Sequence, residues 1–198
     1  MDAEAAELRV LGCLIEKQRT TPDVYPLSLN ALRAACNQST NRDPVVDYDD
    51  SAIRDGLQRL SRRGWVRLAS GPGSRAVKYR HLFDEAIGLS GGEISLLAVL
   101  MLRGAQTPGE LKLRTERLHG FGSLAELHET LDALIARELV ERQPRRPGQK
   151  EERYAHLLGA PAGDRAAPAP APNSLEARVA RLEEQIGELL DALGSRSV

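Results

Sequence analysis

Basic side chains gather in one segment of this chain, and their types and spacing favour contact with nucleic acid. Between Ser51 and His81 the sequence has eight basic residues and one acidic residue, a local net charge of +7 in a chain whose net charge is −1. Arginine and glutamine form paired hydrogen bonds with guanine and adenine edges, and basic side chains also neutralise phosphates. The predicted DNA-contacting residues are Arg42, Arg54, Gln58, Arg59, Arg62, Arg63, Arg75 and Lys78.

A helix over about residues 50–63 must position most of these side chains. If Ile53, Leu57 and Leu60 face the core, helical geometry turns Ser51, Asp55, Gln58 and Arg62 to the solvent, with the remaining arginines beside them. The alternative is a charged helix face that only meets water. Because a hairpin with further basic residues follows, and the two converge on one side in a winged helix, we favour DNA contact.

Two more helices and the hairpin complete the first predicted domain. Apolar residues at helical spacing predict a helix over residues 3–19, and Ser28 is a predicted N-cap for a second. Strand-like runs cover residues 65–69 and 76–81, around the turn residues 71–74. Three helices followed by a hairpin is the order of a winged helix.

The same pattern returns in the second half of the chain. Apolar residues from Ile94 to Leu100 repeat those from Leu8 to Leu14, and Tyr154 and His156 repeat Tyr79 and His81. We align Thr107-Pro108 with Thr21-Pro22, which places the extra length of the first copy between its second and third helices. The predicted fold is therefore mainly α with small β-hairpins (α+β). It comprises winged-helix domains at 1–86 and 87–158, an Ala/Pro-rich linker at 159–173 and a C-terminal coiled-coil-like helix at 174–198.

The last helix has an apolar seam at heptad spacing, which predicts self-association into a homodimer. Folding back onto the globular body is the alternative. The seam residues are Leu175, Val179, Leu182, Ile186, Leu189 and Leu193.

The third helix of the second copy has a different surface. It is predicted to turn Ala125, Glu129, Asp132, Ala133 and Ala136 outward, and its carboxylates would repel phosphates. We therefore expect the second copy to bind a partner protein or form a dimer, although Arg145 and Arg146 remain available to a phosphate.

A polar run over residues 37–44 has two interpretations. Its amides and Arg42 would suit a nucleic-acid backbone. Alternatively, Asn37 ends the second helix, and Asn41, Arg42 and Asp43 tie a buried connection by hydrogen bonds. We favour the structural interpretation.

The sequence offers no pattern typical of an enzyme, a metal site or a cofactor site. Cys13 and Cys36 lie on apolar helix faces without metal-ligand spacing, and His81 and His156 recur at matching positions, which indicates packing. Nucleotide-binding glycine motifs and nucleophile motifs are absent from the sequence. With two cysteines, no signal-peptide pattern and no apolar run of about 20 residues, we expect a cytoplasmic protein outside the membrane.

Several longer motifs resemble those of the YceH-like family of bacterial proteins. They are the run LGCLIEKQRTTPDVYPLSLNALRAACNQSTNRDPV (residues 11–45), the stretch 70–79, RGAQTPGEL (103–111) and the Arg153-Tyr154-x-His156-Leu157 ending. The resemblance implies a pair of winged-helix domains and a coiled-coil-like C-terminal helix, in a family with no established function or catalytic residue.

Two functions compete on these grounds. The first is a dimeric transcriptional regulator that reads duplex DNA with the third helix and hairpin of the first copy. The second is a protein-binding scaffold, favoured by the acidic second copy and the C-terminal seam.

Overall fold

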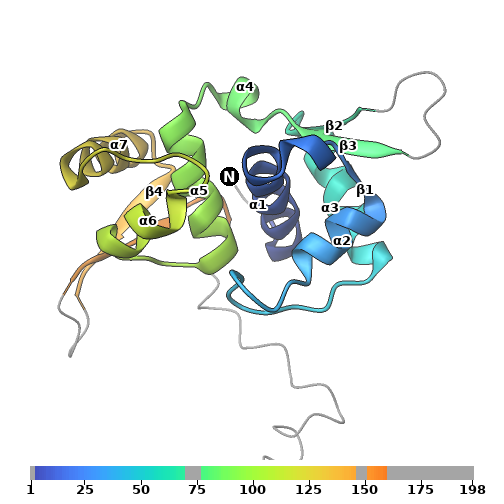
Figure 1. Cartoon of the computed structure of the whole chain (residues 1–198), viewed down its shortest axis with the longest axis horizontal. Helices are drawn as coiled ribbons and strands as arrows, with labels where there is room; N and C mark the ends of the chain where they lie inside the picture. Colours follow the sequence, from blue (N-terminus) through green and yellow to red (C-terminus); the bar gives the residue numbers. More distant parts are fainter. Residues whose placement is uncertain (1–2, 70–76, 146–150, 160–198) are drawn as a thin grey trace, which may run out of the picture. The chain divides into compact units, whose positions relative to one another are not determined.

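The protein is mainly helical with small antiparallel sheets, which confirms the predicted fold class. The computed structural model describes residues 3–69, 77–145 and 151–159 (Figure 1). The described helices are α1 (Ala5–Thr20), α2 (Leu29–Cys36), α3 (Asp50–Arg62), α4 (Phe83–Ile87), α5 (Gly91–Arg103), α6 (Pro108–Thr115) and α7 (Leu124–Ala136). The described strands are β1 (Leu27–Ser28), β2 (Val66–Leu68), β3 (Lys78–His81), β4 (Val140–Gln143) and β5 (Arg153–His156). The predicted hairpin tip at 71–74, residues 160–173 of the predicted linker and the predicted C-terminal helix at 174–198 lie outside the described residues.

Side-chain caps begin α2 and α3, and the cap of α2 is the predicted Ser28. The Ser28 hydroxyl accepts a hydrogen bond from the Ala31 amide, and the Asp49 carboxylate accepts one from the Ala52 amide. After α3, Gly64 adopts a positive φ of 74°, a conformation that glycine reaches without strain. The chain then enters a three-stranded sheet of order β1-β3-β2.

The second copy repeats this order of elements. Thr107 and Ser123 cap α6 and α7, and β4 pairs with β5 in an antiparallel hairpin. An isolated bridge from Gln106 to Tyr154 takes the place of the β1–β3 pairing, in which Leu27 lies opposite Tyr79. Three helices followed by a hairpin thus occur twice, and their interpretation as tandem winged helices stays a prediction.

Our alignment of the two copies was wrong at Thr107-Pro108. Thr107 caps α6 as Ser28 caps α2, so its counterpart is Ser28 and not Thr21. The first copy has an additional 3-10 turn at Pro22–Val24 between its first and second helices. Part of the extra length of the first copy therefore lies before α2. Thr21-Pro22 begins this extra turn, whereas Thr107-Pro108 begins α6.

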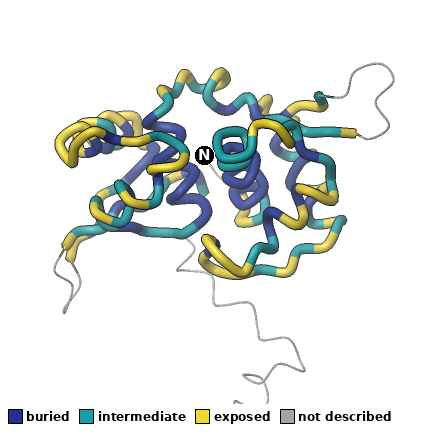
Figure 2. The backbone as a smooth tube through the Cα atoms, in the orientation of Figure 1, coloured by how far each residue is buried: buried dark blue, intermediate teal, exposed yellow. Residues whose placement is uncertain are grey.

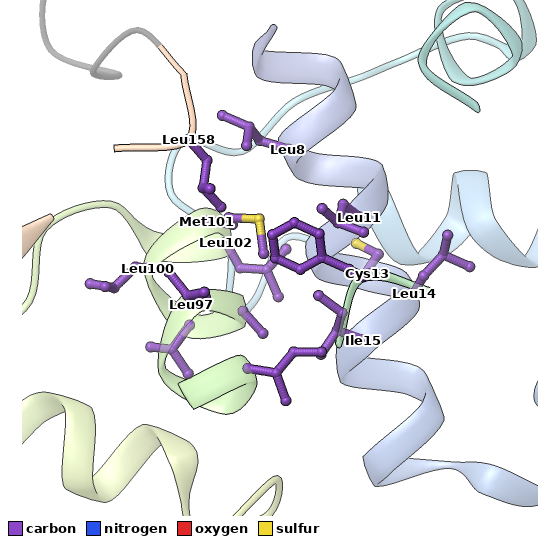
Figure 3. Packing of buried hydrophobic residues seen from close by; sticks show 14 of the residues in the cluster. Leu8, Leu11, Cys13, Leu14, Ile15, Leu97, Leu100, Met101, Leu102 and Leu158 are labelled. Carbon is purple, nitrogen blue, oxygen red and sulfur yellow. The ribbon is translucent and has the colours of Figure 1, made fainter. Parts of the chain in front are cut away.

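The first helices of the two copies pack against each other and form the centre of one core. Leu11, Leu14 and Ile15 of α1 are completely buried, as is Leu97 of α5 (Figure 3). Both helices are buried over most of their length (Figure 2). Gly12 permits this approach, because a Cβ atom there would lie 2.9 Å from Leu102 Cγ. The described residues all belong to one compact unit.

The third helices lie on the two flanks of this central pair. α3 packs on α1, and α7 packs on α5, so that α3 and α7 face opposite sides of the unit (Figure 1). None of the described helices is long and apolar enough to cross a membrane.

Candidate nucleic-acid interface

The outward face of α3 has the composition that the sequence predicted. Ile53, Leu57 and Leu60 are buried against the core. Arg54 and Arg62 are consequently exposed on the opposite side, with Gln58 between them. Within the described chain, neither arginine forms an ion pair with a carboxylate.

A cleft of about 620 Å³ separates this face from the hairpin. Both elements contribute its lining, which is Arg54, Asp55, Leu57, Gln58, Ser61, Arg62, Val66, Arg67, Leu68 and Tyr79. Arg67 is exposed on β2, and Leu68 beside it is 62% exposed despite its apolar side chain. The helix and the hairpin thus present guanidinium groups and an apolar surface to one cleft.

Two predicted contact residues belong to another part of the surface. Arg59 forms an ion pair with Glu4, and Arg63 Nε lies 3.4 Å from Glu7 Oε1. Both glutamates come from the start of α1. The Arg63 guanidinium also lies over the ring of Trp65, 5.4 Å from its centroid. These pairs neutralise part of the local +7 charge, so the candidate interface excludes Arg59 and Arg63.

Arg42 is an internal residue, which corrects its assignment to the DNA-contacting set. Its side chain has no exposed surface and makes two hydrogen bonds with the Glu16 carboxylate, of 3.1 and 2.6 Å. It also donates to the Ala35 carbonyl and to Gln38 Oε1. Burial alone would raise the pKa of Glu16, but the hydrogen bonds and charge of Arg42 outweigh burial and lower it. No phosphate can reach a guanidinium enclosed in this way.

The rest of the polar run supports the same structural role. Asn37 ends α2, and its amide group donates to the Tyr48 carbonyl at 2.8 Å and accepts from the Tyr48 amide at 2.9 Å. The Asp43 amide donates to the Leu102 carbonyl of α5, and Arg103 donates to Asn41. This segment therefore ties the first copy to the second.

The remaining hairpin residues divide between described and undescribed positions. Lys78 lies on β3 opposite Ser28, and Arg75 lies outside the described residues. Arg80, the last basic residue of the hairpin, forms an ion pair with Glu85 at 3.0 Å.

The corresponding surface of the second copy differs in charge. Glu129 and Asp132 are exposed on α7, together with Ala133 and Ala136. Arg142 on β4 lies 3.7 Å from Asp132 Oδ1 and 3.8 Å from Glu152 Oε2. Arg145 is exposed, whereas Arg146 and Lys150 fall outside the described ranges. Carboxylates of this copy thus pair with the strand arginines Arg142 and Arg153, which makes the surface unsuited to phosphates.

The cysteines and His81 are buried, and His156 is half-buried. Cys13 and Cys36 are fully buried. Burial lowers the pKa of His81 and of His156 to about 4. In the portion of the chain that the structure describes, no three His, Cys, Asp or Glu side chains come together as metal ligands.

The sequence reasoning missed the apolar side of the cleft. Leu68 pairs with Tyr79 across the hairpin, and paired positions in an antiparallel sheet face the same side. The alternation in the strand sequences was the available signal for this side. The ion pairs from Glu4 and Glu7 had no such signal, because they join residues far apart in the sequence.

Comparison with known proteins places these features in a family. The family model described as "Protein of unknown function, DUF480" matches residues 3–149. The UPF0502 protein of Opitutus terrae is 47% identical over 187 residues, covering 92% of this chain and 81% of that protein. The UPF0502 protein of Serratia proteamaculans is 43% identical over 201 residues, covering 97% of this chain and 94% of that protein. The UPF0502 protein YceH of Salmonella enteritidis is 43% identical over 202 residues, with coverages of 96% and 94%.

Proposed function

This chain belongs to the DUF480 family, which confirms the resemblance to YceH-like proteins, and we propose that it binds duplex DNA through α3 and the β2–β3 hairpin. In this proposal it is a non-enzymatic, cytoplasmic transcriptional regulator. The first copy reads the DNA, and the second copy faces away from it.

The exposed cations of the α3 cleft are the observation that carries the proposal. Arg54, Arg62 and Arg67 line one cleft, and none of them forms an ion pair within the described chain. By contrast, Arg59 and Arg63, on the other side of α3, are paired with glutamates. Arginines that have no ion pair within the protein can neutralise DNA phosphates. The counterions condensed on the DNA are then released, which favours binding.

The dimensions of the elements fit B-form DNA. A helix such as α3 fits the major groove, which is about 12 Å wide. A hairpin beside it lies over the adjacent backbone or minor groove, so one sugar–phosphate strand would pass through the cleft between them. Gln58 then faces base edges, while Arg54, Arg62 and Arg67 lie at its borders within reach of phosphates.

A charge reversal tests the proposal. The double variant Arg54→Glu with Arg62→Glu should weaken duplex binding at least about 100-fold. It should also make the plot of log association constant against log salt concentration less steep by about 2, since two phosphate contacts are lost. The matched control is Lys112→Glu with Arg117→Glu, which makes the same charge change in the second copy. Equal affinity of the Arg54/Arg62 variant and the wild type, or an equal loss in both variants, would contradict a specific α3 interface.

A protein-binding scaffold is the second candidate. It is supported by the exposed carboxylates of α7 and by Leu113 of α6, whose side chain is 78% exposed. Under this proposal the wild type retains no DNA at about 0.15 M salt and forms a stoichiometric complex with a partner protein.

Dimerisation stays part of the regulator proposal. Its seam, residues 175–193, lies outside the described residues, so it rests on the heptad spacing alone. Sedimentation of the full chain, compared with a chain ending at residue 161, measures whether this segment makes the dimer.

A further inference from the structure

Asp55 lies within the cationic surface of α3, where a carboxylate opposes DNA binding. It is the one acidic residue between Ser51 and His81, and it lines the cleft beside Arg54 and Gln58. An exposed carboxylate near phosphates is repelled by them. A residue that lowers affinity at this position therefore needs either a structural role or a role in choosing the base sequence.

The structural roles that α3 offers to an aspartate are taken by other residues. Asp49 caps the helix, and Asp50 pairs with Arg33. Among the described residues, none donates a hydrogen bond to the Asp55 carboxylate or forms an ion pair with it. Asp55 is exposed and leaves both oxygens available as acceptors.

Asp55 also lies in line with Gln58, which faces base edges in the proposed complex, and with Arg62. Asp55, Gln58 and Arg62 are three and four residues apart, which places them along one stripe of the helix. At 1.5 Å of rise per residue the stripe is about 10 Å long, close to the length of three base pairs. Along this stripe the Asp55 carboxylate only accepts hydrogen bonds, the Gln58 amide both donates and accepts, and the Arg62 guanidinium only donates.

We propose that Asp55 selects cytosine by accepting a hydrogen bond from its exocyclic amino group in the major groove. This inference rests on the proposed DNA binding by α3. Carboxylates accept from the cytosine amino group, as glutamine pairs with adenine and arginine with guanine. Thymine presents a carbonyl oxygen at the corresponding position, and guanine presents two acceptors, so both are repelled by the carboxylate.

Selection from a random duplex library tests this role. The wild type should enrich cytosine at one position, and Asp55→Ala should lose this preference while keeping those at neighbouring positions. The same variant should bind a non-selected duplex about two- to tenfold more tightly, because a repelling charge is removed. The matched control is Glu129→Ala, the equivalent position on α7, which should leave both the preference and the affinity unchanged.

The outcomes separate this inference from the function on which it rests. If the wild type retains no duplex at low salt, the proposed function itself is wrong. If the wild type binds but enriches no cytosine, or Asp55→Ala keeps the cytosine preference, DNA binding stands and the role of Asp55 is overturned. A tighter but equally selective Asp55→Ala variant would likewise overturn it, since Asp55 would then act only as a repelling charge.

Discussion

Arg63 lies 3.4 Å from Glu7 Oε1, and this ion pair joins the end of α3 to the start of α1. The second copy repeats it, because Arg137, which follows α7, lies 3.1 Å from Glu93 Oε1 at the start of α5. In both copies the glutamate also closes the capping box of its helix. Arg63, which was predicted to contact DNA, thus forms an ion pair that both copies share.

Loss of this pair should reduce stability. Glu7 is 99% buried, so Arg63→Ala leaves a carboxylate without its counter-charge and should lower the free energy of unfolding by about 1–3 kcal/mol. Arg62→Ala removes an exposed arginine and should change it by less than about 0.5 kcal/mol. Urea unfolding followed by circular dichroism measures both. Glu7→Gln combined with Arg63→Ala should recover part of the loss, and a full additive loss would mean that the two residues are not coupled.

Arg42 should matter for stability and not for direct DNA contact. Arg42→Ala removes both hydrogen bonds from the partly buried Glu16 carboxylate and leaves it only its 3.3 Å ion pair with Lys17 among the described residues, which should cost about 3–5 kcal/mol. At a temperature where the variant is still folded, the salt slope of its DNA binding should equal that of the wild type, because no phosphate contact is lost. A slope lowered by about 1, with unchanged stability, would return Arg42 to the interface.

His81 and His156 should make stability fall in mild acid. The pKa of His156 is lowered by burial from 6.5 to about 4 in the folded state, and His81 behaves alike. Between pH 6.5 and 4 the unfolded chain therefore binds protons that the folded chain does not, so the free energy of unfolding decreases as the pH falls through this range.

His156→Gln removes one of these titrating groups. Urea unfolding at pH 7, 6 and 5 should show a smaller decrease for this variant than for the wild type, whatever its stability at pH 7. Parallel curves for the two proteins would show that His156 titrates alike in the folded and unfolded chains.

Gly12 should be required for the packing of α1 on α5. A valine at this position adds atoms where a Cβ would already lie 2.9 Å from Leu102 Cγ, so Gly12→Val should lower the free energy of unfolding by about 1–3 kcal/mol. Gly56→Val is a less crowded comparison, since its nearest atom would be 3.6 Å from the Cβ. Greater stability of Gly12→Val, as measured by thermal unfolding, would contradict the close approach of the two helices.

Local features of the fold could be predicted from the sequence. The helix expected at 3–19 is α1 (Ala5–Thr20), Ser28 begins α2 as expected, and the helix expected at about 50–63 is α3 (Asp50–Arg62). These features depend on apolar periodicity and capping, which act over a few residues. The extra turn at Pro22–Val24 was not predicted. A Thr-Pro pair indicates a break in the chain, but it does not show which elements of the two copies correspond.

The candidate site could be predicted only in part, because some of its features depend on residues far apart in the sequence. The outward direction of Arg54, Gln58 and Arg62 follows from helix geometry alone. Whether an arginine is available depends instead on distant carboxylates, and Glu4, Glu7 and Glu16 come from the first helix. The local charge between Ser51 and His81 is therefore larger than the basic surface, because Arg59 and Arg63 are paired; Arg42, outside this segment, is paired as well.

Retention of genomic DNA tests the central claim most directly. Purified full-length protein is mixed with sheared DNA from its own genome at about 0.15 M salt, and the retained fragments are sequenced. We expect discrete enriched sites for the wild type and their loss in Arg54→Glu with Arg62→Glu. Uniform retention, no retention, or the same sites retained by the double variant would contradict a sequence-reading α3.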